Sequence, residues 1–311
     1  MDAVPDADVD ITDALVRRLL ASQHPDLAGL PLERADNGWD NVVYRLGDRL
    51  GVRLPRRGAA HRPLLNELRW LPFLAPRLPL PVPAAARRGR PAPGYPYHWA
   101  VVPWFEGRSA ALARPGERDA YAAQLAGFLR ALHVPAPGDA PRSPVRGVPL
   151  ALRAESLAAR LATGRLPQGD TLRAVFAEGT RAPLHRGPAL WLHGDPHPHN
   201  MVVHPAAAGA PARLAAVVDF GDLTAGDPAS DLAAAWLHFT ARGRSVFRAA
   251  LADGSGRPRH DDDAWLRARG WAVHLGAVMA LLPADDPLHA VGRHALRQVV
   301  EECGSAVSGL G

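Results

Sequence analysis

The sequence predicts an α+β protein of two lobes, with strands concentrated in its first third and helices in the remainder. Short segments rich in apolar and β-branched residues occur at 43–46, 50–54 and 98–103, next to turn-forming residues, as is typical of strands. From residue 117 onward, apolar residues recur mainly at three- and four-residue spacing, which indicates helices. Strands followed by a run of helices favour the α+β class.

A helix and then a hairpin are expected near the N-terminus. Asp10 can cap a helix, and apolar residues follow it at helical spacing: Ile11, Leu15, Val16, Leu19 and Leu20. The segments 43–46 and 50–54 flank the turn pair Gly47-Asp48. This arrangement predicts a β-hairpin or meander.

The first lobe is expected to end shortly after residue 100. A helix over 61–71 should end or kink at Pro72, because proline removes a helix hydrogen bond. The proline-rich passage 77–98 is expected to hold one strand and a turn, before a buried strand at 98–103. We interpret 104–108 as the hinge, so the lobes span 1–103 and 104–311.

The second lobe is predicted to be helical around one interruption. Helical apolar spacing covers six segments: 117–133, 152–162, 171–179, 230–242, 262–282 and 287–303. Short strands near 201–203 and 214–218 interrupt them, and the most distinctive motif of the chain lies there.

Composition indicates a globular protein of the cytoplasm. Of 311 residues 47% are hydrophobic, and no apolar run approaches twenty residues, so no membrane span is expected. The acidic N-terminus lacks the basic region of a secretory signal. The single cysteine, Cys303, excludes an internal disulfide and fits a reducing compartment.

The charge pattern argues against nucleic acid as a partner. All basic residues are arginine and the net charge is +5. These arginines are scattered among 31 acidic residues, with no basic run interleaved with aromatics, unlike a nucleic-acid footprint. An anionic nucleotide is the more economical partner.

The stretch 191–204, WLHGDPHPHNMVVH, and the VVDFGD that begins at Val217 carry the clearest chemistry. Asp195 is followed five residues later by Asn200, and Asp219 ends a later apolar segment. Phosphoryl transfer from ATP uses a carboxylate that orients a hydroxyl, and an Asn and an Asp that hold Mg²⁺. The D-x₄-N and D-F-G order matches the catalytic and metal loops of kinases. We therefore expect Asp195 to be the catalytic base, and Asn200 and Asp219 to be magnesium ligands.

This pattern resembles the aminoglycoside phosphotransferase family, the small-molecule branch of the protein-kinase-like fold. The usual motif of the family is close to H-G-D-x-H-x-x-N, followed later by I-D-F/W-G/E. In this chain the first part is formed by His193, Gly194, Asp195, His197 and Asn200. The second part is formed by Asp219, Phe220, Gly221 and Asp222. The resemblance implies a small β-rich N-lobe, a larger helical C-lobe, and ATP or GTP with Mg²⁺. It also implies that His193 orients the catalytic loop and that Asp231 braces it.

Arg53 departs from the kinase pattern. A kinase-like small lobe normally carries a lysine on its third strand, paired to a helix glutamate. The third strand expected here, LGVRLP, has Arg53 as its only basic residue, and strand alternation places it opposite the apolar face. Glu67 is the natural partner, and arginine can bind phosphate bidentately. Two alternatives are a surface role for Arg53, and a weakened or inactive kinase.

The rest of the nucleotide site is expected in two places. The loop 35–41 lies where a phosphate-covering loop belongs, so Asn37, Gly38 and Trp39 could lie over the phosphates; an ordinary hairpin turn explains it equally well. The adenine is expected to form backbone hydrogen bonds near Pro103, Trp104 and Phe105.

The acceptor site is less clear from the sequence. In the family it is built by the helical lobe, where acidic side chains meet cationic aminoglycosides; the candidates are Asp261, Asp262, Asp263, Asp285, Asp286, Glu301 and Glu302. Each can instead stabilise a helix end. Trp236, Trp265 and Trp271 could line a sugar or simply pack in the core. The positive net charge favours a neutral or anionic sugar-bearing compound, such as a nucleoside antibiotic.

The predicted function is phosphate transfer from ATP or GTP to a hydroxyl of a small molecule, as antibiotic resistance. A metabolic kinase acting on homoserine, choline or a sugar is the first alternative, and a nucleotide-binding pseudokinase the second. A metal-dependent hydrolase is a third, because several ligand-type residues lie close in sequence: His193, Asp195, His197, His199 and His204. That hydrolase would leave Asn200 and Asp219 unexplained.

Overall fold

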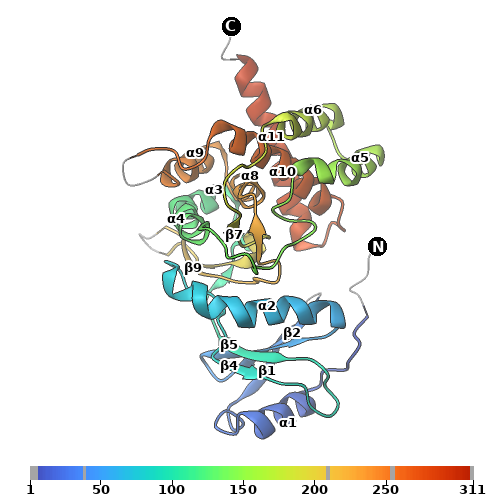
Figure 1. The fold of residues 1–311 in the computed structure, drawn as a ribbon, viewed down its shortest axis with the longest axis vertical. Coiled ribbons are helices and arrows are strands. Elements are labelled where there is room, and N and C mark those ends of the chain that lie inside the picture. The colour runs from blue at the N-terminus through green and yellow to red at the C-terminus, as the bar shows by residue number, and fades with distance from the viewer. Residues whose placement is uncertain (1–5, 38–39, 208–210, 253–255, 309–311) are drawn as a thin grey trace. The chain divides into compact units, whose positions relative to one another are not determined.

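The computed structural model describes residues 6–37, 40–207, 211–252 and 256–308. The chain forms two compact units (Figure 1). One contains Met1–Glu106 together with Val217–Leu223, and the other contains Gly107–Ala216 and Thr224–Gly311. The main sheet lies in the first unit and most helices lie in the second, so the predicted α+β class is confirmed.

The first unit is built on a five-stranded antiparallel sheet of order β1-β2-β3-β5-β4. The strands are β1 Leu32–Asn37, β2 Asn41–Leu46, β3 Leu50–Pro55, β4 Arg87–Gly89 and β5 Trp99–Pro103. The expected hairpin is formed by β2 and β3, with Leu46 opposite Leu50. Gly47 adopts a φ of 58° in the turn, a conformation that glycine reaches without steric cost.

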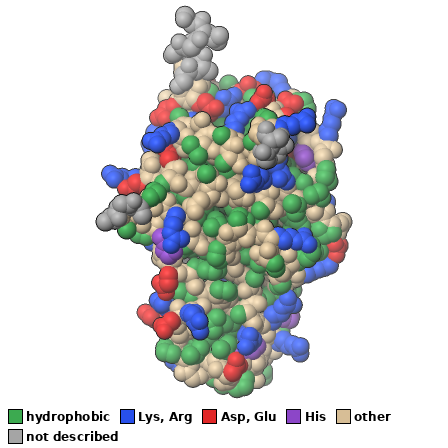
Figure 2. Space-filling view, turned by 90° about the vertical axis from the view of Figure 1, so that its left-hand side faces the viewer, with side chains coloured by type: hydrophobic (Ala, Val, Ile, Leu, Met, Phe, Trp, Pro, Cys, Tyr) green, Lys and Arg blue, Asp and Glu red, His purple; other side chains and the backbone are tan. Residues whose placement is uncertain are grey.

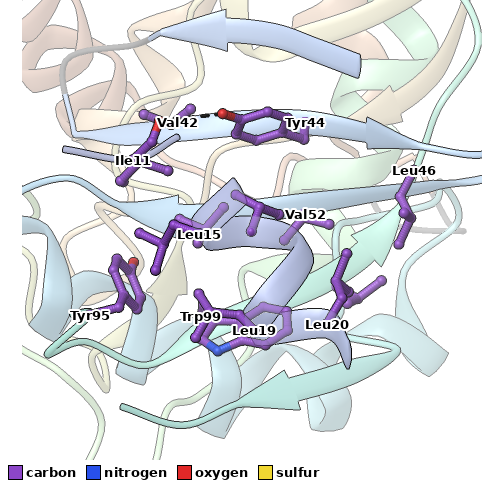
Figure 3. Close-up of a cluster of buried hydrophobic side chains, with 13 residues drawn as sticks. Ile11, Leu15, Leu19, Leu20, Val42, Tyr44, Leu46, Val52, Tyr95 and Trp99 are labelled. Carbon is purple, nitrogen blue, oxygen red and sulfur yellow. Dashed lines mark hydrogen bonds between the residues drawn. The ribbon is translucent and has the colours of Figure 1, made fainter. Parts of the chain in front are cut away.

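Helix α1, Asp13–Gln23, covers one face of this sheet. Figure 3 shows its apolar side chains against those of the strands; the cluster includes Leu15, Leu19, Leu20, Val42, Tyr44, Val52 and Trp99. The expected helix is therefore present, but its cap is Thr12 instead of Asp10. The Thr12 hydroxyl oxygen accepts a hydrogen bond from the Leu15 amide at 3.3 Å, because a capping side chain reaches an amide three residues ahead.

Helix α2, Gly58–Leu74, packs against the sheet through Leu64 and Leu68, which contact Ala100 of β5. The neighbours of Ala100 in β5, Trp99 and Val101, belong to the cluster beneath α1. Since successive residues of a strand face opposite sides, α1 and α2 lie on opposite faces. The sheet is thus the middle of three layers (Figure 1).

Of the two outcomes expected at Pro72, an end of the helix is wrong, because α2 continues to Leu74. Proline at this position cannot donate to the carbonyl oxygen of Leu68, four residues earlier. That oxygen instead accepts a hydrogen bond from Arg88 Nη2 at 2.6 Å. A side chain of β4 therefore replaces the missing helix bond.

In the second unit, four expected helices are confirmed: α5 Ala154–Ala162, α6 Gly169–Arg181, α10 Asp262–Ala280 and α11 Pro287–Ser308. Helix α10 is almost entirely buried and packs against α6 and α11 (Figure 1). No described helix has the length and apolarity needed to cross a membrane.

Two other expected helices are broken. The segment 117–133 contains α3 Pro115–Arg118 and, after a turn, α4 Ala122–Leu132; the segment 230–242 contains α7 Ala229–Leu232 and α8 Ala234–His238, before α9 Ala241–Ala250. The second break has a visible cause. The Thr240 amide donates to Asp119 Oδ1 at 3.0 Å, so it makes no helix bond, and Phe239 is extended.

Short strands surround the motif region. β7 Leu190–Leu192 pairs with β10 Thr224–Gly226, while β6 Arg108–Ser109, β8 Met201–His204 and β9 Arg213–Val217 form a three-stranded sheet. The strands expected at 201–203 and 214–218 are thus confirmed as β8 and β9. The loop 193–200 runs between β7 and β8, and the loop that carries Asp219 follows β9.

Candidate active site

The backbone before Asp195 is held by one buried carboxylate. Asp231 Oδ2 accepts a hydrogen bond from the His193 amide at 2.8 Å, and Asp231 Oδ1 accepts one from the Gly194 amide at 3.0 Å. His133 Nε2 lies 3.1 Å from Asp231 Oδ2. The bracing role that the resemblance implies for Asp231 is confirmed by these bonds.

Two further contacts set the shape of the catalytic loop. Gly194 has a φ of 89°, which a residue with a side chain rarely adopts. The fully buried His193 accepts a hydrogen bond from the Asp195 amide through Nδ1, at 3.2 Å. This contact is of the kind expected of a residue that orients the loop, the role that the resemblance implies for His193.

The Asp195 carboxylate lies between Arg146 and His197. Arg146 Nη2 is 3.4 Å from Oδ1, and His197 Nε2 is 3.2 Å from Oδ2. Burial alone would raise the pKa of Asp195, but the adjacent His197 and Arg146 outweigh it and hold that pKa well below its usual range. The carboxylate is therefore ionised at neutral pH, which is the state required of a general base.

Asn200 is the last residue of the same loop, 193–200. Its Nδ2 donates to the Asp195 carbonyl oxygen at 2.9 Å, which directs its own Oδ1 away from that bond. An amide oxygen is a hard donor of the kind that Mg²⁺ prefers. The geometry is compatible with the expected ligand role.

Asp219 belongs to the first unit. The Val217 amide donates to the Pro81 carbonyl oxygen at 3.0 Å and ties the start of the loop to that unit. Asp219 has a φ of 59°, a left-handed conformation that is uncommon for a residue other than glycine and is often found at functional sites. Its side chain is 56% exposed, so a hard carboxylate is available for a cation.

Arg53 connects two carboxylates in this unit. Its Nη1 lies 2.6 Å from Glu67 Oε2 of α2, and its Nη2 lies 3.3 Å from Asp219 Oδ1. The side chain is only 11% exposed, so Arg53 is not a surface residue of the strand. The pairing with Glu67 that the kinase pattern predicts is present.

Burial and charge compete at this pair. Burial alone would lower the pKa of Arg53, but Glu67 and Asp219 raise it, so the guanidinium stays charged. Burial raises the pKa of Glu67 to about 7, and the charge of Arg53 offsets part of this effect. A fixed positive charge thus lies beside Asp219.

The segment expected to contact adenine offers one free donor. Pro103 has no amide N–H, and the Trp104 amide donates to the Arg49 carbonyl oxygen at 2.8 Å. Within the described ranges the Phe105 amide forms no hydrogen bond. Of the loop expected over the phosphates, Gly38 and Trp39 lie outside the described residues.

The metal-cluster alternative is not supported. Among the described residues, no group of three or more His, Cys, Asp or Glu side chains is arranged to hold a metal ion. The loop histidines have other partners: His193 accepts from a backbone amide, His197 contacts Asp195, and His199 Nδ1 lies 2.8 Å from Ser109 Oγ.

The acidic candidates for the acceptor site are mostly used in local structure. Asp261 caps α10 by accepting from the Ala264 amide at 2.8 Å, and Asp286 accepts from the Leu288 amide at 2.8 Å. Glu302 Oε2 accepts from Trp236 Nε1 at 2.6 Å. The three candidate tryptophans are buried: Trp236, Trp265 and Trp271. These contacts match the structural alternative for each of them.

Arg146 is the site residue that the sequence analysis missed. It lies in the proline-rich segment 135–149, which carries no periodic pattern or motif. Its position beside Asp195 depends on folding of that segment, where the Gly147 carbonyl oxygen accepts from the Asp227 amide at 2.9 Å. No sequence signal distinguishes Arg146 from the other arginines.

Comparisons with known proteins find several solved structures of similar fold. Aminoglycoside 2'-phosphotransferase-IIIa in complex with GDP is 16% identical, with a TM-score of 0.64, and the match covers 94% of this chain and 100% of that one. Macrolide 2'-phosphotransferase MphH from Brachybacterium faecium is 20% identical, with a TM-score of 0.58, over 92% and 98% of the two chains. These likenesses establish a shared fold. A search of curated proteins found no match.

The family assignment comes from the sequence itself. Residues 31–271 match the model of the phosphotransferase enzyme family, a span that exceeds half of the chain and includes Arg53, Asp195, Asn200 and Asp219. The protein therefore belongs to the phosphotransferase enzyme family and is a small-molecule kinase.

Proposed function

We propose that this kinase transfers the γ-phosphate of ATP or GTP to a hydroxyl of an antibiotic in the cytoplasm, and so confers resistance. The observation that carries the proposal is the ionised Asp195 carboxylate on a braced loop. Support for an antibiotic acceptor comes from the names of the similar structures, which are aminoglycoside and macrolide phosphotransferases.

In this proposal Asp195 orients the acceptor hydroxyl and takes its proton as the oxygen attacks the γ-phosphate in line. Arg53, held by Glu67, would contact the phosphates, and the segment Pro103, Trp104 and Phe105 would contact the base. Asn200 and Asp219 would hold Mg²⁺, which neutralises phosphate charge when bound. The chain's own contribution is positioning and fixed charge.

The charges around Asp195 bear on the acceptor. Its side-chain contacts are with Arg146 and His197, and the charge of Arg146 would repel a polycationic aminoglycoside. A neutral or anionic acceptor is therefore favoured. Because metabolic acceptors such as sugars are neutral, a metabolic kinase is the second candidate. The pseudokinase is disfavoured because Asp195, Asn200 and Asp219 are all present.

The test is nucleotide consumption by the purified protein with Mg²⁺ and either ATP or GTP, across a panel of hydroxylated compounds. The panel contains aminoglycosides, macrolides, nucleoside antibiotics, homoserine, choline and simple sugars. We expect consumption that depends on one compound, together with a mass gain of one phosphate on it. Absence of any nucleotide binding would contradict the proposal at its first step.

A further inference from the structure

A cavity of about 510 Å³ lies in the second unit, beside the N-terminal end of helix α10. Its walls come from three parts of the chain: the loop 183–187 with the start of β7, Pro228 before α7, and residues between 259 and 267 around the start of α10. This volume falls within the range of about 300–1,000 Å³ that is usual for small-molecule sites. We call it the α10 cavity.

Positive side chains enter the α10 cavity from two of its walls. Arg186 belongs to the loop before β7, and Arg259 precedes α10. In the part of the chain that the structure describes, neither forms an ion pair with a carboxylate; Arg259 Nη2 donates to the His133 carbonyl oxygen. Both guanidinium groups are therefore available to an anion, and guanidinium binds carboxylate and phosphate with paired hydrogen bonds.

A buried histidine lies in the same wall. His260 lines the α10 cavity although it is only 9% exposed. Its Nε2 is buried, and among the described residues no group bonds to either of its ring nitrogens. Burial, followed by the charges of His133 and Arg259, lowers the pKa of His260 to about 3, so the ring is neutral and carries one N–H donor. A buried polar group without a partner is costly, and an acceptor oxygen in the cavity would offset that cost.

The two acidic side chains of the cavity wall are compensated by α10. Asp261 caps the helix and accepts a hydrogen bond from the Ala264 amide at 2.8 Å. Asp263 lies in the first turn, where the positive end of the helix dipole offsets its charge. On the face shown in Figure 2, arginines and acidic side chains are interspersed. The character of the cavity therefore depends on its own lining side chains.

We propose that the α10 cavity binds a small organic molecule through an anionic group, a carboxylate or a phosphate. Arg186 and Arg259 contact the oxygens of this group, and His260 donates a hydrogen bond to it. The rest of the molecule contacts Leu184, which is 58% exposed, and Leu190, which lines the same cavity. This binding does not depend on the proposed kinase reaction, because no residue assigned to that reaction lines the cavity.

The experiment measures binding of phenyl phosphate and of benzoate by calorimetry, with benzyl alcohol as the uncharged control. The full chain is saturated with Mg²⁺ and a non-hydrolysable ATP analogue, so that the phosphate site of the proposed kinase is filled. The cavity variants are Arg186→Gln, Arg259→Gln and Asp263→Asn. Arg181→Gln and Asp262→Asn are the matched controls, because both side chains are exposed and neither lines the cavity. Thermal unfolding of each variant shows that it is folded.

We expect each of the two arginine variants to weaken binding of the anionic probes by about tenfold, since each removes a charged hydrogen bond. Asp263→Asn should strengthen binding by about threefold, because it removes a like charge from the wall. The control variants should leave the affinity unchanged, and benzyl alcohol should bind more weakly than either anion. The tighter of the two anions identifies the anionic group.

Absence of anion binding would overturn the proposal, as would an affinity that is the same in Arg186→Gln and Arg259→Gln as in the original chain. Equal binding of benzyl alcohol would show that the anionic charge is not recognised, and would also overturn it. Failure of the ATP analogue to bind would contradict the proposed function alone, because the same comparison of variants can be made without the analogue.

Discussion

Arg53 lies on β3, the third strand, where kinase-like folds usually carry a lysine. Its guanidinium reaches Glu67 Oε2 with one terminal nitrogen and Asp219 Oδ1 with the other. A lysine offers a single ammonium on a flexible stem and cannot bridge the two carboxylates in the same way. The Arg53 side chain therefore links α2 to the metal loop as well as supplying charge.

The first prediction concerns this bridge. Arg53→Lys should weaken nucleotide binding by about tenfold, because a point charge replaces the contact made by two guanidinium nitrogens. Arg53→Ala should in addition lower the unfolding free energy by about 3 kcal/mol, because it leaves Glu67 buried and unpaired. Nucleotide titration and urea denaturation measure the two effects. The exposed Arg49, substituted to Lys, is the control. Unchanged nucleotide affinity in both Arg53 variants would refute the role.

A second prediction concerns the protonation of Asp195. Its pKa is depressed, so the ionised base persists as pH falls and is lost only when pH drops through that low value. Arg146→Gln removes one cation and should raise the pKa, moving the acid limb of the kcat profile to higher pH. The pH dependence of kcat with the acceptor found in the panel tests this. An acid limb that stays in place would show that Arg146 does not act on the base.

The site residues differ in how far sequence alone can predict them. Asp195, Asn200 and Asp219 follow from spacing within one local motif. The contact between Arg53 and Glu67 follows from the kinase pattern, and strand alternation gives only the direction of the Arg53 side chain. Arg146 could not be found in this way, because its contact with Asp195 joins positions 49 residues apart. Tertiary folding of a loop without periodicity creates that contact.

At the scale of elements, helix ends and breaks depend on distant side chains. Helix α2 passes Pro72 because Arg88, 20 residues from Leu68, fills the vacant bond. The break after α8 depends on Asp119, which is 121 residues from Thr240. Local rules predict the existence of most helices here, whereas their ends depend on partners that no local window contains.

The third prediction tests the support of α2. Arg88→Ala should lower the unfolding free energy by about 1 kcal/mol, since the Leu68 carbonyl loses its donor at an edge that water can partly reach. Arg87→Ala is the matched control, because its contact with Asp26 is long, at 3.5 Å, and exposed. Equal losses in the two variants, measured by urea denaturation, would argue against the explanation for Pro72.

The fourth prediction concerns the brace of the catalytic loop. Asp231→Ala leaves the His193 and Gly194 amides without their acceptor, and should cost about 3 kcal/mol together with most of kcat. Asp262→Ala, at a side chain 91% exposed, should change stability by less than about 0.5 kcal/mol. Denaturation and turnover are measured on both variants. Full turnover in Asp231→Ala would contradict the bracing role.

At the scale of the whole molecule, the order of strands and helices along the chain was sufficient to predict the α+β class. The membership of the segment Val217–Leu223 in the first unit was not predictable from that order, because it depends on contacts such as the Val217 amide with Pro81. Consequently Asp219 belongs to one compact unit, while Asp195 and Asn200 belong to the other.

The most direct test of the proposed function is to measure turnover and nucleotide affinity together in Asp195→Asn. Asparagine keeps the size of the side chain but cannot accept the hydroxyl proton. We predict that kcat falls by about a hundredfold or more, while nucleotide affinity stays within about twofold of the original. Turnover that persists in Asp195→Asn, or nucleotide binding lost in parallel with it, would contradict the assignment of Asp195 as the catalytic base.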